Sequence, residues 1–105
     1  MQERRQAERV PSSLYAIWEM TQQSVFSGDV ANFSTSGCFV QSRSGVPARP
    51  VLDIRFRLPT ERWMTLQGSV VYVGEQHGFG VNFAELSRED RRMLELLIEY
   101  YRDEP

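Results

Sequence analysis

The segment from residue 52 to residue 58 alternates strictly between apolar and charged side chains. Successive side chains of a β-strand point to opposite faces, so this period of two predicts a strand with one buried face and one wet face. Strands of this kind are typical of antiparallel sheets and barrel walls, because parallel sheets are covered on both faces. The fold is therefore predicted to be mainly β. The alternation sets Leu52, Ile54, Phe56 and Leu58 against Asp53, Arg55 and Arg57, between Pro50 and Pro59.

Further strands are predicted where β-branched and aromatic residues gather between clusters of turn-forming residues. Ser27, Gly28 and Asp29 predict a bend within one of them, and Gly80 predicts a bulge or a close backbone approach within another. A short loop with a glycine at each end, residues 74–78, joins the last two strands as a hairpin. These additional strands are predicted over residues 13–18, 24–33, 38–40, 63–73 and 79–83.

The C-terminal segment has the pattern of a helix. Ser87 is a favourable N-cap, and Glu89 and Asp90 follow it in the first turn, where the helix dipole favours acidic side chains. Apolar residues then recur at spacings of three and four. About six strands followed by one terminal helix predict a closed or nearly closed antiparallel β-barrel with the helix against it. The apolar stripe consists of Met93, Leu94, Leu97, Ile98 and Tyr101, widened by Leu96 and Tyr100.

The chain is predicted to form one domain over residues 1–105, which is an ordinary domain size. Residues 1–11 are polar and charged, and nothing apolar before Val10 could anchor them to a core. They are predicted to form a flexible, exposed arm. The barrel is predicted over residues 12–86 and the helix over residues 87–103.

Composition excludes several classes of protein. A formal net charge of −2 argues against a general binder of nucleic acid polymers, although a small anionic ligand could still be held by a local cluster. The single cysteine, Cys38, permits no internal disulfide and no cysteine-based metal site. There is no apolar run long enough for a membrane span and no signal peptide, so a cytoplasmic location is expected and a membrane partner is not.

Catalysis has no support in the sequence. The one histidine, His77, lies in the glycine-flanked loop, and Cys38 opens an apolar strand, where a cysteine behaves as a small buried hydrophobe. No two carboxylates have the spacing of an acid/base pair. The glycines at 78 and 80 lead into a strand, unlike a phosphate-binding loop, which leads into a helix. The chain is predicted not to be an enzyme, and neither a metal nor a cofactor is expected.

Two polar clusters remain as candidates for binding. Arginines 4, 5 and 9 lie in the arm, and residues 32–37 form a concentrated turn signal. An arginine fork can meet the N7 and O6 acceptors of guanine or bind a phosphodiester. The Asn32 carbonyl can accept from guanine N1–H or N2–H₂, the Ser34 hydroxyl can donate or accept, and Gly37 tolerates a close flat base or a positive φ.

These clusters resemble the two motifs of the PilZ domain family, which are RxxxR on an N-terminal loop and [DN]xSxxG at the start of a strand. Arg5 and Arg9 match the first motif, and Asn32, Ser34 and Gly37 match the second, 23 positions after Arg9. The last strand and the terminal helix are also similar to those of the family. The resemblance implies a six-stranded antiparallel barrel with a C-terminal helix, and a receptor for the bacterial second messenger cyclic di-GMP.

Two details of the motifs bear on affinity and stoichiometry. Asn32 stands where the family more often has aspartate, and its amide offers one oxygen where a carboxylate offers two. Arg4, next to Arg5, resembles the additional arginine of members that bind a mutually intercalated pair of ligand molecules. The number of ligands per chain, one or two, stays open.

Three functions are compared. The resemblance implies a stand-alone cyclic di-GMP receptor whose ligand orders the arm, and which signals in trans to an unidentified effector protein. The alternative is an interaction adaptor of the same fold that binds no nucleotide. A binder of single-stranded nucleic acid would need basic residues interleaved with exposed aromatics on strands. Here the basic residues concentrate in the arm, at Arg55 and Arg57, and on the helix.

Overall fold

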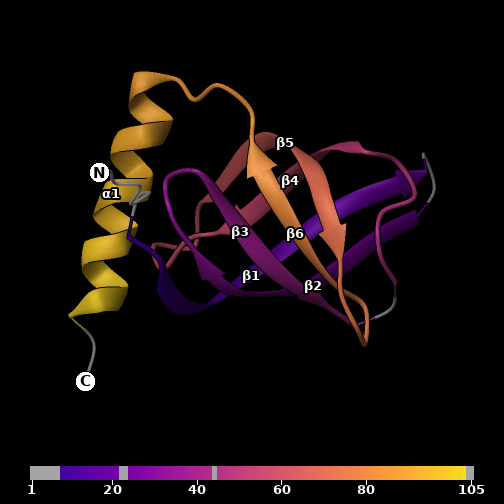
Figure 1. The fold of residues 1–105 in the computed structure, drawn as a ribbon. Helices are drawn as coiled ribbons and strands as arrows, with labels where there is room; N and C mark the ends of the chain where they lie inside the picture. Colours follow the sequence, from indigo (N-terminus) through magenta and orange to yellow (C-terminus); the bar gives the residue numbers. More distant parts are fainter. Residues whose placement is uncertain (1–7, 22–23, 44, 104–105) are drawn as a thin grey trace, which may run out of the picture.

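The structure, a computed structural model, describes residues 8–21, 24–43 and 45–103. In these residues antiparallel strands close into a barrel in the order β1-β2-β3-β6-β5-β4, and a helix lies across one end (Figure 1). The predicted fold class, a six-stranded antiparallel barrel with a C-terminal helix, is therefore confirmed. The strands are β1 (Val10–Thr21), β2 (Ser24–Phe33), β3 (Gly37–Ser42), β4 (Val51–Arg57), β5 (Trp63–Val73) and β6 (Gly78–Phe83), and the helix is α1 (Arg88–Arg102).

The alternating segment forms β4 and behaves as its pattern predicts. Leu52, Ile54 and Phe56 face the interior, while the residues between them lie at the surface. β4 pairs with β5 along its whole length, and with β1 only where residues 54–57 lie opposite residues 15–18. This last pairing closes the barrel.

Aromatic side chains fill the interior of the barrel. Trp18, Phe33, Phe56 and Phe79 are each at most 1% exposed. Trp18 and Phe79 meet edge to face, with ring centroids 5.1 Å apart. A small barrel has no channel because inward-facing side chains of this bulk occupy its interior.

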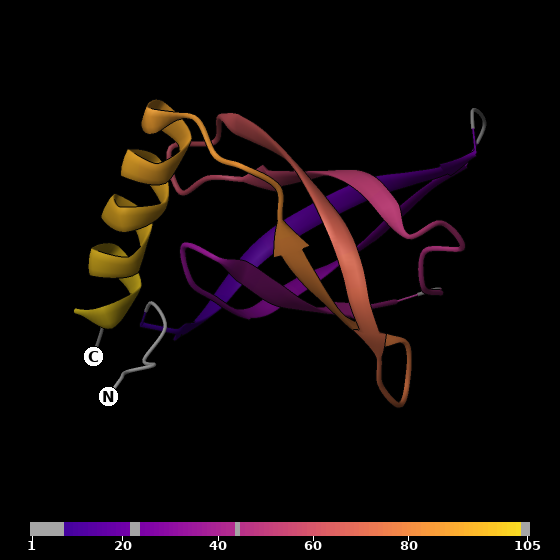
Figure 2. The ribbon, with the colours of Figure 1, turned by 45° about the horizontal axis from the view of Figure 1, so that its top comes forward.

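The predicted start of α1 is correct, because the Ser87 hydroxyl accepts a hydrogen bond from the Asp90 backbone N–H at 3.0 Å. Figure 2 shows the helix standing against the end of the barrel. Its inner face buries Leu94, Leu97 and Ile98. Neither α1 nor any other described segment forms a helix that is long and apolar enough to span a membrane.

The buried stripe of α1 is narrower than predicted. Leu96 is 42% exposed and Tyr100 is 48% exposed, although the sequence pattern widened the stripe to include them. The helix contacts the barrel on one side only, so residues that flank the stripe stay at the surface. The ring of Tyr101 does reach the interior and meets Phe33 edge to face at 6.0 Å.

Two predictions for the first two strands were wrong. β1 begins at Val10, two residues before the predicted barrel start, because Val10 is only 3% exposed and pairs with Phe33. β2 is continuous through the predicted bend at Ser27, Gly28 and Asp29. Gly28 is needed for another reason: a Cβ there would lie 2.5 Å from the backbone oxygen of Gln41 on β3.

The prediction for Gly80 was right about a close approach but wrong about its partner. A Cβ at Gly80 would lie 2.3 Å from the Tyr72 ring, so a side chain and not a backbone covers this glycine. The irregularity lies in the neighbouring strand, where the pairing of β5 with β6 shifts register between Val70 and Tyr72. Val71 is therefore an extra residue on β5, and such a bulge redirects neighbouring side chains.

Candidate functional site

The turn between β2 and β3 is built around Ser34, whose side chain is fully buried. Its backbone N–H donates to the Gly37 carbonyl at 2.8 Å. Its hydroxyl accepts from the Ser36 backbone N–H at 3.1 Å and contacts the Ser36 hydroxyl at 2.9 Å. The hydroxyl proposed for a ligand from the sequence is thus engaged within the turn, where it fixes the conformation of the loop.

A glycine is required at position 37 for a structural reason that the sequence did not reveal. Its φ is not positive, so the left-handed region that a glycine tolerates is not used here. Instead the backbone of β6 passes directly against it, and a Cβ at Gly37 would lie 2.2 Å from the Val81 carbonyl oxygen. The glycine is required by the tight pairing of β3 with β6.

Asn32 is placed by a bulge in β2. The pairing of β2 with β3 shifts register between Val30 and Asn32, which leaves Ala31 as an extra residue. Val30 and Phe33 are both buried, and the two residues between them turn outward. Asn32 is therefore half-buried, with its amide at the outer surface of the barrel and available to other side chains.

The two motifs meet at this amide. The Arg9 Nε–H donates to Asn32 Oδ1 at 2.9 Å, across 23 positions of sequence. Pairing of Pro11 with Asn32 between β1 and β2 brings the end of the arm to this position. Arg4 and Arg5, the other arginines of the predicted site, lie outside the described residues.

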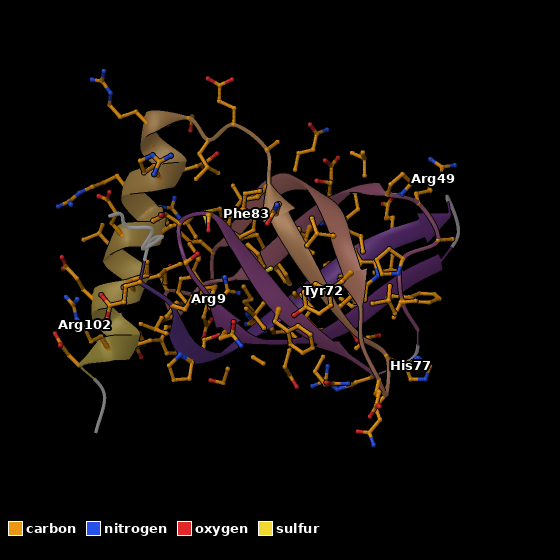
Figure 3. The ribbon with its side chains drawn as sticks, in the orientation of Figure 1. Arg9, Arg49, Tyr72, His77, Phe83 and Arg102 are labelled. Carbon is orange, nitrogen blue, oxygen red and sulfur yellow. The ribbon has the colours of Figure 1, made fainter. Side chains whose placement is uncertain are left out.

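A hollow of about 380 Å³ opens beside this contact. Its wall includes an aromatic pair that sequence reasoning missed: Phe39 and Tyr72 lie nearly parallel, with an interplanar angle of 23° and centroids 5.9 Å apart. Tyr72 is 54% exposed, and Figure 3 shows its place on the barrel surface. Among the residues that line the hollow are Arg9, Asn32, Cys38, Phe39, Tyr72 and Asn82.

The chemistry of this hollow suits a flat, polar, anionic ligand. Arg9 supplies positive charge and a planar set of donors, and Asn32 supplies both an amide acceptor and donors. The exposed ring of Tyr72 offers a surface for stacking. The only sequence signal for this ring was Gly80, which predicted a close approach. The sequence could not show that Tyr72 is the residue that covers this glycine.

Cys38 lines the same hollow but is not a nucleophile. Its side chain is buried, and burial raises the pKa of its thiol to about 12, while the charge of Arg9 acts weakly in the opposite direction. The thiol is therefore protonated at neutral pH, whereas reactive cysteines act as thiolates. Cys38 is a small buried apolar residue, as predicted.

The residue before Arg9 reaches the helix. Arg102, in the last turn of α1, donates to the Glu8 carboxylate at 2.8 Å. Both side chains are about half exposed, so this ion pair adds little to stability. Its effect is geometric, because two adjacent residues contact different elements: Glu8 contacts α1, and Arg9 contacts Asn32 near the end of β2. Figure 3 shows Arg9 beside the helix end of the barrel.

Comparison with solved structures shows the same fold in bacterial proteins. The PilZ domain of YcgR from Escherichia coli, solved with c-di-GMP, matches with a TM-score of 0.78 at 12% identity, over 95% of this chain and 92% of that one. The Bacillus subtilis inhibitor of motility, MotI, matches with a TM-score of 0.77 at 19% identity, over 99% of this chain but 54% of that one.

A third relative is the Borreliella burgdorferi protein PlzA in complex with c-di-GMP, with a TM-score of 0.64 and 15% identity over 93% of this chain and 41% of that one. No curated protein sequence matches the chain. The sequence model of the PilZ domain matches residues 3–100, which is nearly the whole length. The chain therefore belongs to the PilZ domain family, whose members are generally receptors that bind cyclic di-GMP and not enzymes.

Proposed function

We propose that this chain is a receptor for cyclic di-GMP, and that the ligand binds at the hollow beside Arg9 and Asn32. The observation that carries the proposal is the hydrogen bond of 2.9 Å between these two side chains. It brings the arginine of one family motif and the amide of the other to one surface, next to an exposed aromatic ring. Neither motif alone would support the assignment.

Each residue has a role in this proposal. Arg9 leaves Asn32 and donates its planar fork to guanine N7 and O6 or to a phosphate oxygen. The freed Asn32 amide then accepts from the guanine Watson–Crick edge. Tyr72 stacks on a base, which is worth about 1–3 kcal/mol per base for an aromatic platform. Arg4 and Arg5 supply further donors from the arm, and Ser34 and Gly37 hold the turn in position.

The proposed output is a signal in trans to an effector protein, carried by the arm. Glu8 joins the arm to Arg102 on α1, directly beside the arginine that would turn to the ligand. In this proposal, a ligand that redirects Arg9 also changes the neighbouring contact between Glu8 and α1. The surface that an effector reads would consist of the arm and the last turn of the helix.

Calorimetric titration tests the ligand assignment. Cyclic di-GMP should bind the full chain, while GTP and a single-stranded oligonucleotide should bind much more weakly. Arg9→Ala should weaken cyclic di-GMP binding at least tenfold, since charge-assisted hydrogen bonds are worth about 1.5–3 kcal/mol and 1.4 kcal/mol is about tenfold.

The matched control is Arg62→Ala. Arg62 is exposed on the loop between β4 and β5, distant in sequence from both motifs, and it makes no ion pair within the described residues. It should bind like the parent. A parent chain that does not bind cyclic di-GMP would refute the receptor assignment and support the adaptor that uses no nucleotide.

A further inference from the structure

Asn82, near the end of β6, has an exposed side chain on the outer surface of the barrel. Its neighbour Val81 points into the core and is 2% exposed, so the alternation along the strand turns Asn82 outward. β6 lies between β3 and β5 (Figure 1), and Asn82 is opposite Gly37 on the first and Ser69 on the second. A glycine and a serine are too small to cover an asparagine, so its amide stays open to the solvent.

The Asn82 amide has no partner among the residues that the structure describes, because none of the hydrogen bonds there includes its side chain. Asn32, the only other asparagine of the chain, is bonded to Arg9. Both asparagines line the hollow of about 380 Å³ beside Arg9. Asn82 therefore adds one acceptor and two donors to the wall of this hollow, and neither family motif includes it.

The Tyr72 ring lies next to Asn82 on the same face of the sheet. The ring covers Gly80, where a Cβ would lie 2.3 Å from it. Gly80 and Asn82 are two positions apart on β6, so they share a face and their Cα atoms are roughly 7 Å apart. A base that stacks on Tyr72 can therefore turn one of its edges toward the Asn82 amide.

Cyclic di-GMP carries two guanines, and the contacts proposed above for Arg9 and Asn32 serve the edges of one of them. β3 separates β2 from β6, so Asn32 and Asn82 are two strand spacings apart, roughly 10 Å or more. The two amides thus stand on opposite sides of the hollow. A ligand with two bases can use both of them.

We propose that Asn82 is a ligand-binding residue, whose amide hydrogen-bonds the Watson–Crick edge of the second guanine while that base stacks on Tyr72. The amide oxygen accepts from guanine N1–H, and the amide nitrogen donates to O6. Stacking on an aromatic ring together with hydrogen bonds to the Watson–Crick edge is how proteins read an unpaired base. The inference rests on the proposed function, and it assigns the second base of the ligand to a residue outside both motifs.

The surroundings of Asn82 favour a base edge over a phosphate. Phosphodiesters are bound through cationic donors. Arg9 is the only cation among the described residues that line the hollow, and Asn32, which is bonded to it, lies across β3 from Asn82. We therefore expect the phosphates near Arg9 and the arm, and a neutral base edge beside the neutral amide of Asn82.

Calorimetric titration of the full chain with cyclic di-GMP tests this contact. Asn82→Ala and Asn82→Leu should each weaken binding about tenfold, since a bidentate contact to a base edge is lost. Leucine has nearly the size of asparagine, so its loss isolates the hydrogen bonds from the bulk. The Tm of both ligand-free variants should stay close to that of the parent, because the side chain is exposed and unbonded in the described structure.

The matched control is Gln67→Leu. Gln67 is also an exposed amide, on β5, and it does not line the hollow beside Arg9. This variant should bind cyclic di-GMP like the parent. An equal loss of affinity in Gln67→Leu and Asn82→Leu would overturn the assignment of a specific contact to Asn82.

Asn82→Asp distinguishes a base edge from a phosphate. A carboxylate accepts from guanine N1–H and N2–H₂ but repels a phosphate, so Asn82→Asp should bind more tightly than Asn82→Leu. Gln67→Glu, an equal change of charge outside the hollow, measures the general electrostatic effect. After that correction, Asn82→Asp binding more weakly than Asn82→Leu would overturn the contact with guanine.

The same titrations separate this inference from the receptor assignment. A parent chain that does not bind cyclic di-GMP would refute both. A parent that binds, with weakened binding in Arg9→Ala but parental affinity in Asn82→Ala and Asn82→Leu, would refute the role of Asn82 and leave the receptor assignment in place.

Discussion

Ser34→Ala separates two roles for this motif residue, direct contact with the ligand and support of the turn. The parent hydroxyl is fully buried and bonds to the Ser36 N–H at 3.1 Å and to the Ser36 hydroxyl at 2.9 Å. Alanine removes the oxygen and leaves the Ser36 N–H without its partner. The structure thus predicts that the substitution lowers the stability of the ligand-free protein.

The expected loss follows from these contacts. A typical intramolecular hydrogen bond contributes about 0.5–1.5 kcal/mol, and only a buried donor left without a partner costs about 1–3 kcal/mol. Ser36 is exposed, so water can replace the lost partner of its N–H, and we expect Ser34→Ala to lower the free energy of unfolding by about 0.5–1.5 kcal/mol. For a domain of this size, each kcal/mol corresponds to about 4–8 °C in Tm.

Thermal and urea unfolding of the free chain measure this loss, and titration with cyclic di-GMP measures binding in parallel. Ser13→Ala is the matched control, because Ser13 is exposed on β1 and should tolerate the change within about 0.5 kcal/mol. A Ser34→Ala variant with parental stability but weakened binding would refute the support role and assign Ser34 to direct contact.

Three further predictions follow from the same surface. Tyr72→Ala should weaken cyclic di-GMP binding by about tenfold or more, while Tyr72→Phe should bind like the parent. Calorimetric titration of both variants tests this, and parental affinity in Tyr72→Ala would show that the ring does not stack. Gly37→Ala should lower the free energy of unfolding by about 1–3 kcal/mol in urea, because its Cβ would lie 2.2 Å from the Val81 carbonyl oxygen; an unchanged midpoint would contradict that crowding. Since burial raises the pKa of Cys38 from 9.0 to about 12, the unfolded chain loses this proton first, and stability should fall from about pH 9 to pH 12. The free energy of unfolding, measured at each pH, should fall less steeply in Cys38→Ala than in the parent. Equal pH dependence in the two proteins would contradict the raised pKa.

The sequence by itself determined the elements whose evidence is local. The alternation in β4 and the spacing of three and four in α1 are periodicities of neighbouring residues, and each one predicts its own secondary structure. The capping serine of α1 is equally local, since Ser87 bonds a residue three positions on. The order of the two motifs along the chain also indicated the family before any fold was known.

Only the tertiary structure decided what the residues of the site do. Gly37, a candidate for a close base or a positive φ, lies tightly against the backbone of β6. The Ser34 hydroxyl, a candidate for a ligand contact, is buried and bonded within the turn. The position of the Tyr72 ring accompanies a bulge in β5 and the absence of a side chain at Gly80 in β6. These roles arise from contacts between strands that are distant in sequence, and a pattern read along one strand contains no information about its neighbour across the barrel.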